Sequence, residues 1–317
     1  MVIRIGMLLI GSFIGALLCV SIYIGARAES EIPRHGKLLE VGGIKLHIRE
    51  IGDLDSEYPP IVLIHGASAN LRDMEMSLGN ALADEFRVIL IDRPGRGYSE
   101  RGKDGYSLLR QAVLIQSAVK ALSAENPIIV GQSFGGAVAL RYALQFQEEV
   151  SGLVLLAPVS HEWPGGVVWY NRVCAIPVIG HIFRWLVIPA YGQVVLDRGV
   201  DGTFAPNAAP ENYVERSGLQ LLFRPQDFKS NAEDVAKLKG EIIKQQRRYS
   251  ELDLPVTILT GLDDDTVSPD IHSRALEAQI QDAKLTLFEN TGHALQHSRT
   301  KEIVTAIRTI AYSVPTQ

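Results

Sequence analysis

Short, fully apolar runs alternate along the chain with amphipathic stretches. Such runs are typical of strands that are covered by helices on both faces. The alternation predicts a mainly parallel sheet wrapped by helices. The predicted strands are "IVLIH" (61–65), "FRVILI" (86–91), "IIVG" (128–131), "LVLLA" (153–157), "VTILT" (256–260) and "LTLF" (285–288). Helical spacing occurs at about 70–84, 105–123, 134–146, 270–281 and 299–311.

Two regions of the body depart from this alternation. Residues 38–50 alternate apolar and polar positions around Gly42-Gly43, which predicts a β-hairpin at one edge of the sheet. Between "LVLLA" and "VTILT" there is no comparable strand run, only an aromatic-rich stretch with a strongly helical piece at about 226–249. We interpret it as an insertion. It is either a packed helical subdomain or a lid that lines an apolar pocket, and the two interpretations are compatible.

The N-terminal segment has a different character from the body. Ile5 to Ala26 is almost wholly apolar and uncharged, long enough to cross a bilayer as a helix. We expect it to lie outside the globular fold, as a retained single-pass anchor with the body on the exported side. The alternative is a signal peptide cleaved near Ala26-Arg27-Ala28, which would leave a secreted or periplasmic protein. Basic residues flank the segment on both sides and do not fix its orientation.

Composition and charge exclude several classes of protein. With 317 residues, 46% of them hydrophobic, the chain can bury a large core, and a net charge of −5 gives no footprint for nucleic acid. Cys19 lies in the apolar segment, so Cys174 has no partner for an internal disulfide in the body. The chain has no G-x-x-x-x-G-K-[ST] loop, and "GRGYSE" (95–100) lacks the third glycine of a dinucleotide turn.

The stretch "IIVGQSFGGAVAL" (128–140) places a serine where a predicted strand turns into a predicted helix. Ligands gather at the carboxyl ends of strands in such sheets, and Ser133 follows one directly. A sharp strand-to-helix turn strains the backbone and needs small neighbours, a need that Gly131 and Gly135 meet. The amide of Phe134, at the helix N-terminus, would face a developing oxyanion beside Ser133. The pattern predicts a nucleophilic serine, against the alternative of a simple Gly/Ser helix entry.

A serine hydroxyl needs a base to remove its proton. His293, in "ENTGHALQH" after the last predicted strand, lies at a carboxyl strand end and is the best candidate. His297 stands four residues later, but no H-E-x-x-H motif accompanies the pair, so we expect no metal.

The base needs an acid to orient it, and "TGLDDDTVSP" (260–269) supplies candidates after another predicted strand. Consecutive carboxylates repel one another, which suggests that the loop has some use beyond carrying charge. The chain order is then Ser133, Asp264 or Asp265, and His293.

Together these motifs resemble the α/β-hydrolase fold family over about residues 36–313. "LIHGASAN" (63–70) is similar to its His-Gly oxyanion loop, and "DRPGRGYS" (92–99) to its turn after the fourth strand. The resemblance implies that the amides of Ala67 and Phe134 form the oxyanion hole. It also implies a helical cap at 159–250, an α/β-hydrolase core at 29–158 and 251–317, and an N-terminal segment at 1–28. Counting from Gly261 favours Asp264 as the acid, and counting from Pro269 favours Asp265; we prefer Asp264.

These residues predict a capped serine hydrolase that cleaves an ester or related acyl compound without a cofactor. Its substrate would be a small molecule with an apolar moiety, because the predicted cap is aromatic. The same triad would also serve a carbon-carbon bond hydrolase, a lactonase or a haloperoxidase-like enzyme. Serine at residue 133 argues against the dehalogenases and epoxide hydrolases of this fold family, which are similar but use aspartate there. A non-catalytic, membrane-tethered binding protein is the alternative of a different class.

Overall fold

The computed structural model describes residues 2–314 and has one eight-stranded sheet at its centre. The strand order is β1-β2-β4-β3-β5-β6-β7-β8, with β1 antiparallel to β2, β2 antiparallel to β4, and every other neighbouring pair parallel. This confirms the parallel sheet with an edge hairpin. The strands are β1 (Lys37–Val41), β2 (Ile44–Gly52), β3 (Ile61–Ile64), β4 (Arg87–Ile91), β5 (Ile128–Gln132), β6 (Gly152–Leu156), β7 (Val256–Gly261) and β8 (Lys284–Phe288).

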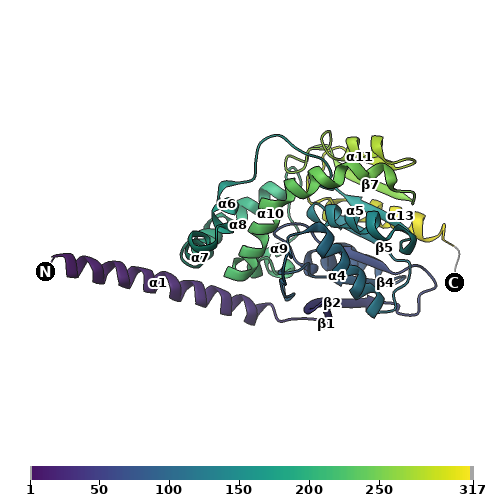
Figure 1. Ribbon diagram of the computed structural model, residues 1–317. Coiled ribbons are helices and arrows are strands. Elements are labelled where there is room, and N and C mark those ends of the chain that lie inside the picture. The colour runs from purple at the N-terminus through teal and green to yellow at the C-terminus, as the bar shows by residue number, and fades with distance from the viewer. Residues whose placement is uncertain (1, 315–317) are drawn as a thin grey trace.

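Helices cover both faces of the sheet, as the continuous apolar strands require (Figure 1). On one face lie α4 (Leu108–Ala121), α5 (Phe134–Phe146) and α11 (Ser273–Gln279). On the other lie α2 (Leu71–Met74), the π-helix η1 (Glu75–Gly79), α3 (Asn80–Leu82), α12 (Leu295–Ser298) and α13 (Thr300–Ala311). The helix predicted at 70–84 is thus three short consecutive helices, and the short α12 was not predicted.

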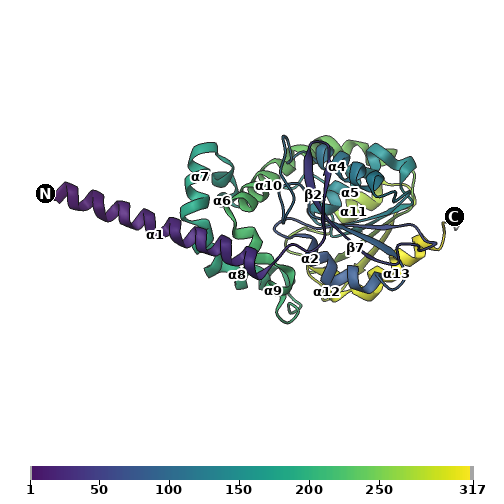
Figure 2. The same ribbon diagram turned by 90° about the horizontal axis from the view of Figure 1, so that it is seen from below.

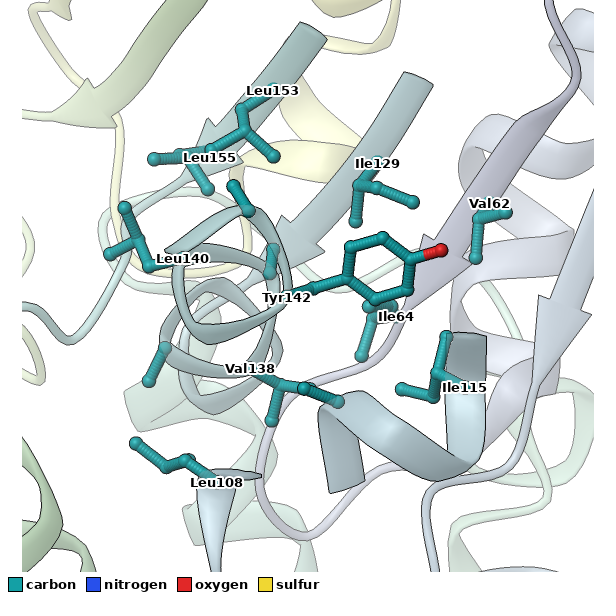
Figure 3. Packing of buried hydrophobic residues seen from close by; sticks show 14 of the residues in the cluster. Val62, Ile64, Leu108, Ile115, Ile129, Val138, Leu140, Tyr142, Leu153 and Leu155 are labelled. Atoms are coloured by element: carbon teal, nitrogen blue, oxygen red, sulfur yellow. The ribbon is translucent and has the colours of Figure 1, made fainter. Parts of the chain in front are cut away.

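The larger core lies between the sheet and α5. Figure 3 shows the ring of Tyr142, on α5, among apolar side chains of three neighbouring strands and of α4. Tyr142 is 1% exposed, so the helix that follows Ser133 is firmly seated on the sheet. Burying side chains of this size stabilises the fold by about 1.5–3 kcal/mol each.

The segment between β6 and β7 is helical throughout its ordered elements and forms one end of the body (Figure 1). We call residues 159–250 the cap segment. Sequence patterning located only its last long helix. Its elements are α6 (Trp169–Ala175), α7 (Pro177–Leu186), α8 (Ile188–Phe204), α9 (Tyr213–Ser217), η3 (Leu219–Phe223), α10 (Pro225–Gln245) and η4 (Gln246–Glu251).

The N-terminal helix α1 (Val2–Glu31) is longer than the predicted apolar segment, and its last third belongs to the fold. Ser21 and Ala28 are buried, and Ala28 packs with Ile32 against Leu221 of the cap segment. The expectation that the whole segment lies outside the fold was therefore wrong. The earlier turns project away from the body (Figure 1). Residue 1 and residues 315–317, at the ends of the predicted first and last segments, lie outside the described residues.

Candidate active site

Ser133 occupies a strained turn between β5 and α5. Its backbone has φ 53° and ψ −115°, a conformation that costs a non-glycine residue about 1–3 kcal/mol. A Cβ on Gly131 would stand 2.6 Å from the carbonyl carbon of Gly135, and one on Gly135 would stand 2.7 Å from the carbonyl oxygen of His65. Only glycine fits at either position, so the sequence interpretation of the turn is confirmed.

His293 and Asp264 are hydrogen-bonded to each other. The distance from His293 Nδ1 to Asp264 Oδ2 is 2.7 Å, and both side chains are buried. Asp264 Oδ1 accepts hydrogen bonds from the amides of Thr266 and Val267, each at 2.8 Å. Asp265 is exposed. The geometry thus favours Asp264 over Asp265 as the partner of His293, with the loop backbone fixing the carboxylate.

Gln132, which the sequence interpretation passed over, contacts the other nitrogen of His293. Its Nε2 lies 3.2 Å from His293 Nε2 and 3.4 Å from the His293 carbonyl oxygen. Among the described residues, Ser133 and His293 share no hydrogen bond. An amide that donates to Nε2 leaves the proton of a neutral imidazole on Nδ1, facing Asp264. This is the tautomer in which Nε2 can accept a proton.

The loop after β3 brings Ala67 close to the serine turn. Ile64 of β3 is paired with Gly131 of β5, so the residues that follow each strand meet at one edge of the sheet. The strand order reverses between these two strands, which is where ligands bind in such sheets. A Cβ on Gly66 would stand 3.2 Å from Ser133 Cβ, so the loop backbone runs alongside the serine.

Arg93, at the start of the turn after β4, holds this loop from beneath. Its Nε donates to the carbonyl oxygen of His65 at 3.0 Å, and its Nη2 donates to that of Gly66 at 3.1 Å. The guanidinium also lies 4.2 Å from the ring centroid of Phe134. The Gly66 carbonyl and the Ala67 amide belong to one trans peptide and point in opposite directions. Arg93 therefore orients the Ala67 amide. It also supports the ring of Phe134, whose amide is the second one of the predicted oxyanion hole.

A buried ion pair links this arginine to the cap segment. Arg93 Nη1 lies 2.7 Å from Asp234 Oδ2, on α10, and neither side chain is exposed. Arg101, which is partly exposed, pairs with the other oxygen of Asp234 at 2.7 Å. Burial and the charge of Arg93 lower the pKa of His65 to about 3, so His65 stays neutral and its Nε2 accepts the Arg93 amide at 3.0 Å.

A cavity of about 520 Å³ lies between the cap segment and the loop after β3. Ala67 and Ser68 are among its lining residues, and Asn231 of α10 accepts a hydrogen bond from the Ser68 amide at 2.7 Å. Most of the remaining lining is apolar. Its aromatic lining residues are Tyr170, Tyr191, Phe204, Tyr213, Phe223 and Phe228. The cavity therefore suits an apolar group that reaches toward Ala67.

His297 belongs to a second buried cluster. Its Nε2 lies 2.9 Å from Asp73 Oδ1, the same oxygen that accepts from Tyr213 of the cap segment at 2.8 Å. Gln296 donates to Asp73 Oδ2 at 3.0 Å. Burial opposes ionisation of Asp73, but His297 and these donors outweigh it and hold the pKa of the carboxyl below its usual value. This cluster joins the cap segment to the helix that follows the His293 loop.

Comparison with known proteins agrees with this architecture. The family profile described as alpha/beta hydrolase fold matches residues 59–168. The chain is 25% identical over 280 residues to a proline iminopeptidase of Pestalotiopsis fici, covering 86% of this chain and 98% of the relative. It is 26% identical over 278 residues to a 2-hydroxymuconate semialdehyde hydrolase of Pseudomonas putida, covering 85% and 91%.

Among solved structures, the enol-lactonase of Burkholderia xenovorans superimposes with a TM-score of 0.70 at 19% identity, covering 86% of this chain and 99% of that one. At this identity the likeness shows the fold alone. The two relatives named above are a peptidase and a hydrolase. The sheet order and the structural likeness show that this chain has the alpha/beta-hydrolase fold, and the profile described by that fold matches residues 59–168.

Proposed function

We propose that the protein is a serine hydrolase that cleaves an ester or a related acyl compound through an acyl-enzyme. The observation that carries the proposal is the buried 2.7 Å hydrogen bond between His293 Nδ1 and Asp264, in a loop beside the strained turn of Ser133. A carboxylate that orients a histidine near a serine at the carboxyl end of a strand is the arrangement that activates a hydroxyl nucleophile.

The residues would act in a fixed order. Ser133 Oγ attacks the substrate carbonyl carbon while His293 Nε2 takes its proton. The amides of Ala67 and Phe134 donate to the oxyanion that forms. His293 then gives the proton to the departing alcohol, and Asp264 stabilises the imidazolium meanwhile. Water, deprotonated by His293, attacks the acyl carbon and releases the acid and Ser133. No step requires a cofactor.

Gln132 gives this mechanism a specific requirement. Its amide donates to the Nε2 lone pair that must accept the serine proton. The amide of Gln132 therefore has to yield that lone pair when Ser133 attacks. In the resting site it holds the imidazole ring in place between two partners, Asp264 and Gln132.

The experiment that tests the proposal is hydrolysis of p-nitrophenyl esters, from acetate to long-chain acyl, by the full chain in detergent. The full chain is needed because Ala28 of α1 packs against Leu221 of the cap segment. Turnover that disappears in Ser133→Ala and persists in Ser68→Ala, a serine on the cavity wall, would support the proposal. Equal turnover by Ser133→Ala and the wild type would refute it. Ligand binding without any turnover would support the binding-protein alternative.

A second candidate, cleavage of a carbon-carbon bond, is favoured by the likeness to the 2-hydroxymuconate semialdehyde hydrolase. The same residues would serve both reactions. Product analysis separates them, because ester cleavage releases an alcohol, whereas carbon-carbon cleavage of a diketone-like substrate releases a ketone or an enol.

We also infer a division into an α/β-hydrolase core at 29–158 and 251–317 and a cap at 159–250, with residues 1–28 as a retained anchor on whose exported side the body lies. Support comes from α1: within the described residues, Arg4–Glu31 is the single helix long and apolar enough to span a bilayer by itself. A cleaved signal peptide remains the alternative for this segment, and the mass of the mature protein distinguishes the two.

A further inference from the structure

The cap segment exposes an unusual number of large apolar side chains. We call the following exposed residues the cap apolar face. Its members are Trp169, Ile176, Val178, Ile179, Ile182, Val187, Tyr191 and Val194, on and between α6, α7 and α8. Val178 is 71% exposed and Val194 is 83% exposed. A group of exposed large apolar side chains on consecutive helices is typical of a site of interaction.

Charge is distributed unevenly around this face. From Trp163 to Leu196 the sequence contains no aspartate or glutamate, and its charged residues are Arg172 and Arg184. Arg184 is buried and donates to the Cys174 carbonyl oxygen. A surface of apolar and aromatic side chains with no negative charge fits a lipid bilayer, including one with anionic headgroups.

Helix α1 fixes where a bilayer would lie relative to this face. Most of its described side chains from Arg4 to Val20 are exposed, whereas Ser21 is buried and Ile24 packs against an apolar cluster of the cap segment. At 1.5 Å per residue the free part rises about 25 Å, close to the roughly 30 Å of a bilayer core. The bilayer therefore ends near Ser21, where α1 meets α7 and α8 (Figure 2).

The shape of the two helices favours contact with the bilayer surface. Helices α7 and α8 are apolar enough to be considered together as one span, but they meet at 68°. A straight crossing is incompatible with that bend, and their inner residues are needed by the cap segment, since Ile188 packs with Phe223 and Phe228. Helices with one buried and one exposed apolar side lie in the plane of the interface.

We propose that the cap apolar face rests in the surface of the same bilayer that α1 crosses, and that the cavity receives acyl chains of bilayer-resident lipids. The face and the cavity share α8: Tyr191 belongs to both, and Gly192 and Val195 line the cavity beside exposed Val194. An acyl chain leaving the bilayer along α8 enters an aromatic-lined cavity whose wall includes Ala67. The assignment of lipids as substrates rests on the proposed hydrolase function. The docking of the cap apolar face on the bilayer does not depend on that function.

The docking is tested by a polarity-sensitive fluorophore on the full chain in phosphatidylcholine–phosphatidylglycerol vesicles. The label is placed at Val178→Cys in a Cys19→Ser background; Cys174 is buried, and burial raises the pKa of its thiol to about 11, so it reacts little. A matched control carries the label at Leu54→Cys, which is 58% exposed on the loop between β2 and β3. We expect blue-shifted emission and quenching by acyl-brominated lipids at residue 178 alone.

The docking would be overturned if the label at residue 178 emitted at the same wavelength as the label at residue 54 and were no more strongly quenched by the brominated lipids. Shielding that vanishes in nanodiscs holding one chain each would also overturn it, because the face would then cover a second copy of the chain. Neither readout depends on turnover, so both remain decisive if the hydrolase proposal fails.

The substrate is tested with Val178→Asp/Ile182→Asp, against Leu54→Asp as control. Burial of one such side chain is worth about 1.5 kcal/mol or more, so hydrolysis of a long-chain monoacylglycerol in vesicles should fall at least about tenfold. Hydrolysis of a soluble short-chain ester should be unchanged, and Leu54→Asp should change neither rate. Equal hydrolysis of the vesicle ester by the wild type and the double variant would refute the lipid-substrate assignment. If, in that case, Ser133→Ala alone loses hydrolysis of both the vesicle ester and the soluble ester, the hydrolase proposal still stands.

Discussion

The contacts of Arg93 predict that a side chain outside the reacting groups controls the rate through the oxyanion hole. Arg93→Lys keeps the positive charge but cannot donate to the His65 and Gly66 carbonyl oxygens and to Asp234 at the same time. The peptide that carries the Ala67 amide then loses its charged hydrogen-bond donor. The site keeps all of its reacting groups, so any loss of rate reports the orientation of that amide.

The size of the effect follows from two limits. An oxyanion-hole donor is worth about 10²–10³-fold in kcat when it is removed altogether. In Arg93→Lys the Ala67 amide is still present and only loses the contact that orients its peptide. The charged hydrogen bond that makes this contact is worth about 1.5–3 kcal/mol. The smaller limit applies, so kcat should fall about 10- to 150-fold with KM little changed. Stability should also fall, because a buried ion pair is perturbed.

The assay is ester hydrolysis beside urea unfolding, with Arg101→Lys as the matched control. Arg101 also pairs with Asp234, but its other partners are Pro94 and Glu233 rather than the loop after β3. Arg101→Lys should lower stability and leave kcat within about twofold of the wild type, since it touches no group that donates to the oxyanion. If Arg93→Lys keeps full kcat while folded, or if Arg101→Lys loses as much rate, the assigned role of Arg93 is wrong.

Three further predictions concern the acid, the buried histidine and the second cluster. Asp264→Asn should lower kcat by about 10⁴-fold, because the wrong tautomer of His293 is favoured, whereas Asp265→Asn should stay near the wild-type rate; equal effects would contradict the choice of acid. The pKa of His65 is about 3 in the fold and about 6.5 unfolded, so acidification favours the unfolded state between these values, and the stability advantage of the wild type over His65→Asn in urea unfolding should shrink by about 2 kcal/mol from pH 7 to pH 5. Tyr213→Phe removes a 2.8 Å hydrogen bond to the ionised Asp73 and should cost about 1.5–3 kcal/mol in thermal or urea unfolding; an unchanged midpoint would show that Asp73 does not need it.

The core elements were predictable because their signals are local. A strand covered on both faces must be apolar throughout, so the runs from "IVLIH" to "LTLF" revealed the parallel sheet. The serine turn was equally readable, since the small residues at 131 and 135 are required by direct overlap with neighbouring backbone. The order of the residues along the chain and their positions at the ends of predicted strands then identified His293 as the candidate base and Asp264 as the preferred acid.

The supporting residues were not predictable, because their roles depend on contacts between distant parts of the chain. Arg93 stands within the quoted "DRPGRGYS", but its partner Asp234 is 141 residues away, and nothing in the local pattern indicates the pair. Gln132 was overlooked between a glycine and the serine, since its importance comes from His293. The packing of the cap segment on α1 was missed because an apolar helix buried in lipid and one buried in protein have the same composition.

The left-handed backbone of Ser133 has a consequence for how this protein could evolve. The strain at that residue, about 1–3 kcal/mol, is offset by the packing of the surrounding strand and helix. A glycine there would relax the turn but remove the hydroxyl. The residue with the least backbone strain at position 133 would therefore lack the proposed nucleophile. Selection for stability alone would favour replacement of the serine, so under the proposed function stability and activity make opposite demands on this one residue.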